Sequence, residues 1–220
     1  NRIPDHTGGG TVTWTNPWGE HHYFDNIEVR EDGGTPGFLQ AIKAGLAIKL
    51  KEKMTVEKIR LRENELVKEC FESLSNISGL HLLAKEARYR LGVFSFYIEG
   101  IHYNLFIKLL NDRFGIQVRG GCSCAGTYGH LLLEVTKEQS KKITNEIDRG
   151  NLSQKPGWVR LSLHPTMTDK ELQYILKGIK STIKNVKEWT KDYDYSPMTN
   201  EFYHKEEAKY RVNTSVFFEV

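Results

Sequence analysis

The alternation of apolar and polar residues predicts four β-strands along the chain. The clearest runs are residues 93–98, Val-Phe-Ser-Phe-Tyr-Ile, and residues 158–163, where polar and apolar positions also alternate. A period of two with aromatic and β-branched residues is typical of a strand that buries one face. Shorter strands are expected over residues 11–15 and 116–118.

Apolar residues spaced by three or four positions predict helices between these strands. They are expected over residues 36–53, 55–74, 105–114, 136–149 and 168–189. Thr35 is expected to cap the first helix, with Pro36 at its first position. Thr168 and Glu171 have the spacing of a capping box at the start of the last helix.

From Gly79 onward, this order of elements predicts a small α+β sheet covered on one side by helices. Residues before it do not complete a βαβ unit, so we interpret residues 1–54 as the end of a larger α/β domain. Residues 55–190 would then be a small C-terminal domain and 191–220 an unassigned tail. The residues expected in the core are Leu91, Phe94, Phe96, Ile116, Leu161 and Ile175.

Composition indicates a globular protein without special surface chemistry. Of 220 residues, 39% are hydrophobic and 27% charged, and the net charge is +3. This near balance gives no indication of a nucleic-acid or membrane partner. Three cysteines do not form a disulfide framework, which favours a reducing cytoplasm. The chain opens without Met in a glycine-rich stretch, which we interpret as the start of a fragment.

The segment from Arg119 to Cys124 reads Arg-Gly-Gly-Cys-Ser-Cys and follows a predicted strand. A thiol on such a loop, near a guanidinium, is a usable nucleophile because the positive charge favours the thiolate. A buried structural cysteine in a tight turn is the alternative. Cys122 and Cys124 would supply only half of the ligands that a zinc site requires.

Two further positions could bind anions. Arg160 lies in the middle of a predicted strand, and its planar fork suits a carboxylate. It could equally face solvent, since Val159 and Leu161 occupy the other face. Thr35 follows two glycines before a helix, where free N–H groups attract anions, although ordinary capping also explains it.

The order of these motifs resembles the second half of class V aminotransferases and cysteine desulfurases. The resemblance covers residues 8–185 and rests on motifs that recur in register. They are Gly8-Gly9-Gly10, Arg30-Glu31-Asp32-Gly33-Gly34-Thr35-Pro36, Leu91-Gly92-Val93-Phe94-Ser95-Phe96, Gly115-Ile116-Gln117-Val118-Arg119-Gly120-Gly121-Cys122-Ser123-Cys124 and Val159-Arg160-Leu161-Ser162.

The resemblance implies a fold-type I pyridoxal-phosphate enzyme that forms a homodimer. Thr35 matches the threonine that binds the cofactor phosphate of the partner subunit. Arg160 matches the arginine that binds the substrate α-carboxylate, and Arg119 an active-site arginine. Cys124 matches the cysteine that accepts sulfur in the desulfurases. The Schiff-base lysine of the family has no counterpart in this chain.

The function implied is that of a pyridoxal-phosphate enzyme acting on an amino acid, as a transaminase, a lyase or a cysteine desulfurase. The chain alone would be inactive without the cofactor lysine. One alternative is a non-catalytic dimerisation or scaffold module. A second is a small metal or redox protein that uses Cys122 and Cys124.

Overall fold

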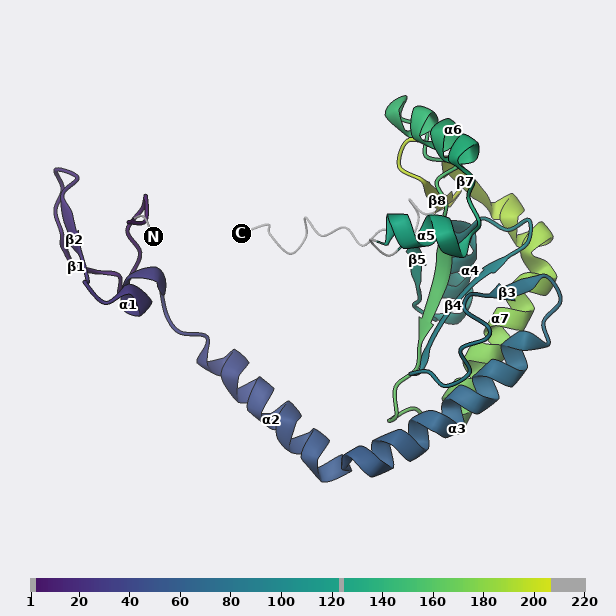
Figure 1. Cartoon of the computed structure of the whole chain (residues 1–220), viewed down its shortest axis with the longest axis horizontal. Helices are drawn as coiled ribbons and strands as arrows, with labels where there is room; N and C mark the ends of the chain where they lie inside the picture. The colour runs from purple at the N-terminus through teal and green to yellow at the C-terminus, as the bar shows by residue number, and fades with distance from the viewer. Residues whose placement is uncertain (1–2, 123–124, 207–220) are drawn as a thin grey trace. The chain divides into compact units, whose positions relative to one another are not determined.

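A computed structural model describes residues 3–122 and 125–206 of the chain. Its elements are labelled in Figure 1. The chain divides into two compact units, residues 1–56 and residues 57–220. Each unit is described separately below.

The first unit combines a short hairpin with helices. Strands β1 (Val12–Thr15) and β2 (His21–Tyr23) pair in antiparallel fashion. Helix α1 (Ile27–Glu31) is capped by Asn26, and α2 (Phe38–Met54) follows. The expected cap of α2 is wrong: its N-cap is Gly37, which offers no side-chain hydrogen bond, and the helix starts after Pro36.

The second unit is a mixed sheet-and-helix layer. Its antiparallel sheet has the strand order β3-β4-β6-β5. The strands are β3 (Leu80–Leu82), β4 (Val93–Ile98), β5 (Arg119–Gly121) and β6 (Trp158–Ser162). The helices are α3 (Val56–Ser75), α4 (Tyr103–Phe114), α5 (Gly126–Leu132), α6 (Lys137–Asp148) and α7 (Asp169–Trp189).

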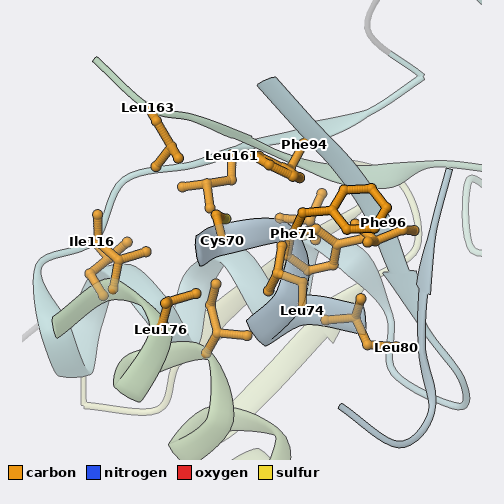
Figure 2. Packing of buried hydrophobic residues seen from close by; sticks show 14 of the residues in the cluster. Cys70, Phe71, Leu74, Leu80, Phe94, Phe96, Ile116, Leu161, Leu163 and Leu176 are labelled. Carbon is orange, nitrogen blue, oxygen red and sulfur yellow. The ribbon is translucent and has the colours of Figure 1, made fainter. Parts of the chain in front are cut away.

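The core lies between one face of this sheet and helices α3, α4 and α7. Phe94 and Phe96 of β4 are fully buried, whereas Ser95 between them is not. Phe71 of α3 packs against Phe94, and Phe106 of α4 meets Phe96 edge to face. Figure 2 shows this cluster of aliphatic and aromatic side chains. The alternate side chains of β4 and β6, which do not enter the core, therefore point to the opposite face of the sheet.

The last described segment is a second hairpin, which sequence reasoning left unassigned. Strands β7 (Tyr193–Ser196) and β8 (Glu201–His204) pair with each other. A short 3-10 turn, Thr190–Asp192, joins β7 to the end of α7. Tyr193 packs with Leu105 and Leu109 of α4 in a small apolar cluster. The hairpin therefore rests on helix α4.

The sequence predicted the main elements well; besides the cap of α2, two further details were misplaced. Phe94, Phe96, Ile116, Leu161 and Ile175 are buried as expected. Leu91, also expected in the core, is 70% exposed. The strand expected over residues 116–118 is wrong, because ladder pairing with β6 begins only at Arg119. In the part of the chain that the structure describes, no helix is long and apolar enough to cross a bilayer.

Candidate functional site

The face of the sheet opposite the core carries the arginines singled out in the sequence. In β6, Val159 and Leu161 point into the core and are at most 2% exposed, so Arg160 points to the other face. Arg160 pairs with Ser95 of β4 on one side and with Arg119 of β5 on the other. Antiparallel pairing places directly opposite side chains on the same face, within roughly 5.5 Å at Cβ. Arg119 and Arg160 are therefore neighbours.

The guanidinium of Arg160 is held without complete hydrogen bonding. Its Nε atom is buried and has no hydrogen-bond partner among the described residues. An unmet buried donor costs roughly 1–3 kcal/mol, and more when the group is charged. Arg119 lies opposite and adds a second positive charge to this face of the sheet. An anion that accepts the Nε–H of Arg160 would relieve the cost of that unmet donor.

The glycine-rich segment after Arg119 packs tightly against helix α4. A Cβ atom added to Gly120 would lie 2.0 Å from Cδ1 of Ile107 and 3.2 Å from the ring of Tyr103. A larger residue would require the side chain of Ile107 to shift, so glycine at this position lets the strand lie close to the helix. Cys122 follows immediately, half-buried and with a free thiol. The catalytic candidate Cys124 lies outside the described residues.

Helix α5 covers the sheet beside Arg160. Trp158, two positions from Arg160 on the same face, is 4% exposed. Its ring lies against Gly129 of α5, where an added Cβ would come within 3.1 Å of the indole. The side chain of His130 then joins α5 to α6 through a 2.9 Å hydrogen bond with Ser140. These helices limit the open surface around Arg160 on one side.

Thr35 lies in the first unit, at a turn held by backbone contacts between glycines. The N–H of Gly34 donates to the carbonyl of Gly9 over 2.6 Å. Thr11, 4% exposed, donates from its hydroxyl to the carbonyl of Gly8 over 2.8 Å. Thr35 itself is exposed, just ahead of the N-cap of α2. Its hydroxyl and the open start of the helix are groups that a phosphate could use.

The structure thus brings Arg119, Arg160 and Cys122 to one region and leaves Thr35 in the other unit. Sequence reasoning missed Ser95 and Trp158, the other side chains near Arg160. The strict alternation in residues 93–98 and 158–163 was a signal for both, because it fixes which positions share a face. Within residues 3–122 and 125–206, no group of three His, Cys, Asp or Glu side chains is placed to hold a metal ion.

Comparison with known proteins shows which proteins this chain resembles. The profile of the family described as Aminotransferase class-V matches residues 1–175. A protein of Halalkalibacterium halodurans named "Probable cysteine desulfurase" is 34% identical over 94 residues, which are 43% of this chain and 22% of that protein. "Probable cysteine desulfurase 2" of Mycobacterium leprae is 28% identical over 121 residues, 54% of this chain and 29% of that one.

Solved structures give the same result for the fold. The apo structure of the cysteine desulfurase from Thermococcus onnurineus NA1 aligns with a TM-score of 0.53 and 25% identity, over 83% of this chain and 40% of that one. The Escherichia coli cysteine desulfurase CsdA aligns with a TM-score of 0.51 at 16% identity, over 83% of this chain and 39% of that one. The chain therefore spans well under half the length of the relatives it matches.

Proposed function

The chain belongs to the class V aminotransferase family, and on that premise we propose that it is the C-terminal, substrate-binding part of a pyridoxal-phosphate enzyme acting on an amino acid. The observation that carries the proposal is the buried Nε of Arg160, which has no hydrogen-bond partner within residues 3–122 and 125–206, beside Arg119. An amino acid always brings a carboxylate, and an arginine fork binds a carboxylate through two parallel hydrogen bonds.

The residues of this chain that would contact pyridoxal phosphate are compatible with its phosphate group. Thr35, exposed at the start of α2, would donate to the phosphate group, and in a homodimer it would serve the second subunit. The cofactor lysine and the partner of the pyridine nitrogen would come from a part of the enzyme outside this chain. We accordingly assign residues 1–54 to the cofactor-binding domain and residues 55–190 to the small domain.

Pyridoxal phosphate, when bound, supplies an electron sink for the α-carbon of an amino acid. The residues of this chain would bind and orient the substrate. Arg160 would hold the α-carboxylate, and its position on the central strand β6 fixes that anchor rigidly. Arg119 would add positive charge from the edge strand β5. The wall formed by Trp158 and α5 would keep water from one side of the carboxylate.

Cysteine is the substrate that the relatives favour, since both curated relatives reported above and the aligned structures carry cysteine desulfurase in their names. In that reaction the thiolate of Cys124 would attack the substrate sulfur, the carbon–sulfur bond would break, and alanine would leave. The sulfur would remain on Cys124 as a persulfide until a thiol reduces it to sulfide. Transamination or lyase chemistry is the other class, and it needs no cysteine at this position.

The test uses the native protein that contains this segment, supplied with pyridoxal phosphate and L-cysteine. Release of alanine and, with a reducing thiol present, of sulfide in equal amounts supports desulfuration. Cys124→Ser should abolish both products, whereas Cys122→Ser should retain them. If Cys124→Ser keeps full activity, the sulfur-accepting role fails. If no amino acid is turned over, the scaffold alternative replaces the enzyme proposal.

Arg160 is tested in the same assay. Removing one partner of a buried charge pair costs roughly 2–5 kcal/mol. Arg160→Ala should therefore raise KM for the amino acid at least tenfold. Arg160→Lys should restore only part of the affinity, because an ammonium cannot form the planar fork. An unchanged KM in Arg160→Ala would exclude the carboxylate role.

A further inference from the structure

Asn200, in the turn between β7 and β8, is buried inside the second unit despite its polar side chain. It is 6% exposed and has a backbone φ of +59°. Its side-chain amide donates to the hydroxyl of Tyr103 over 2.8 Å, and its amide oxygen accepts from Tyr195 over 2.9 Å. Its backbone carbonyl accepts from the side chain of Asn104. An asparagine with so many satisfied contacts holds its neighbours in fixed positions.

Tyr103, the residue that Asn200 holds, forms the support for the glycine-rich segment. Its ring lies under Gly120 of β5 and under Gly157, which precedes β6. An added Cβ at Gly157 would come within 2.6 Å of this ring and within 2.8 Å of the Cα of Gly121. The ring and both backbone segments are therefore in direct contact. A shift of Tyr103 would move the segment that carries Arg119 and Cys122.

A second, parallel contact runs through Asn104, whose side chain donates to the carbonyl of Asn200 and would lie 3.2 Å from a Cβ added to Gly120. An open pocket of about 690 Å³ is lined by Gln117 and Val118 and by Glu201 and Tyr203 of the hairpin. Asn104 and Asn200 also line this pocket. Burial raises the pKa of Tyr103, and the hydrogen bond donated by Asn200 opposes this rise.

We infer that Asn200 is a positioning residue for the proposed active site, acting through Tyr103 on the loop from Arg119 to Cys122. The inference rests on the proposed function, and it assigns a role to a segment beyond residues 1–175, which the family profile matches. The C-terminal hairpin thereby serves the site of the preceding domain.

The test removes the hydrogen bond from each side. Asn200→Gly keeps the positive φ that glycine adopts freely but loses the amide. Tyr103→Phe keeps the ring and loses only the hydroxyl. Hydrogen exchange of the backbone amides of residues 117–122 is measured in both variants of the 220-residue chain. We expect a rise of about fivefold in each, the effect of one net hydrogen bond on a local opening equilibrium.

The matched control is Tyr193→Phe. Tyr193 belongs to the same hairpin and donates to Asp112 of the same helix over 2.9 Å, but it does not contact Tyr103. This variant should leave exchange in residues 117–122 within about twofold of the wild type. An equal rise in Tyr193→Phe and Asn200→Gly would overturn the inference, because the hairpin would then act only by general docking. Unchanged exchange in Asn200→Gly or in Tyr103→Phe would overturn it as well.

Two readouts separate positioning from mere stability. In a Cys124→Ser background, labelling of Cys122 by a maleimide should accelerate about fivefold in Asn200→Gly, and Tyr103→Phe added to it should give no further increase. In the native enzyme, Asn200→Gly should lower kcat about fivefold and raise KM by a smaller factor, because β6 holds Arg160 independently whereas Arg119 moves with the segment. Additive effects on labelling, or a change confined to KM, would refute positioning. The exchange and labelling experiments need no turnover, so their result stands even if the proposed function fails.

Discussion

Gly157 offers the strongest test of how the site segment is packed, because any side chain there meets atoms that cannot move easily. In Gly157→Ala, the new Cβ would lie 2.6 Å and 2.7 Å from ring carbons of Tyr103 and 2.8 Å from the Cα of Gly121. Carbon atoms in good contact are separated by roughly 3.5–4.0 Å. The alanine therefore requires a displacement of about 1 Å in a buried ring that is hydrogen-bonded to Asn200.

Overpacking of this kind costs roughly 1–3 kcal/mol. Urea denaturation followed by far-UV circular dichroism should therefore show a lower midpoint with an unchanged slope. Gly126→Ala is the control, since no atom of the residues that the structure describes lies within 4 Å of a Cβ added there. Equal midpoints for the two variants would refute the packing argument. Tyr103→Leu, which removes the opposing ring, should reduce the penalty of Gly157→Ala in the double variant.

Two further predictions concern the supporting core. Thr168→Ala should destabilise the second unit by roughly 1 kcal/mol, because the hydroxyl of Thr168 caps α7 by accepting from the backbone N–H of Glu171; urea midpoints would show it, with Thr168→Ser close to the wild type. Burial raises the pKa of Cys70 to about 12, so its stabilising contribution is complete below pH ~9 and is lost as the pH rises toward 12. Cys70→Ala should show a smaller fall in unfolding free energy between pH 9 and 11, and an equal fall would contradict the assignment.

The elements with strong local patterns were predictable from the sequence. Residues 93–98 form β4 with the expected bounds, and Thr168 and Glu171 form the expected capping box. Leu91 was misplaced because its position shares the outward parity of Val93, which is 41% exposed, rather than that of Phe94. The pleat decides burial more strictly than hydrophobicity does.

Tertiary pairing explains the other differences. Strand β5 consists of Arg119, Gly120 and Gly121, residues of low strand propensity, and it exists because it pairs with β6. The apolar run of residues 116–118 looked more like a strand, but Ile116 instead points into the core. The hairpin of β7 and β8 carried no Gly or Pro-Gly turn signal. Its turn uses Asn200 with a positive φ, a conformation in which asparagine is enriched, and its side chain is buried against Tyr103 and Tyr195.

The sequence indicated Arg119 and Arg160 as separate candidates, a loop residue and a strand residue, but not how they are arranged. Their direct pairing across β5 and β6 depends on strand order and register, and so does the burial of the Arg160 Nε, which has no partner among the described residues. These are long-range features that a local pattern does not encode.

The carboxylate role of Arg160 can be measured directly in the chain itself. The Nε–H of Arg160 is buried, so its proton should exchange slowly enough to give a resolved signal in a ¹⁵N-correlated spectrum. The signal is assigned by its loss in Arg160→Lys. L-alanine is then added to the chain, and a separate titration with chloride at equal ionic strength serves as the control. Arg62 serves as the reference, since its Nε already donates to the carbonyl of Met167.

We expect the chemical shift of the Arg160 signal to change in a saturable manner with L-alanine, whereas the Arg62 signal should not shift. We also expect that Arg119→Ala weakens this saturation by several-fold, because one of the two positive charges is removed. An Arg160 signal that does not move, or that moves equally with chloride, would contradict the assignment of this face as the substrate-carboxylate site.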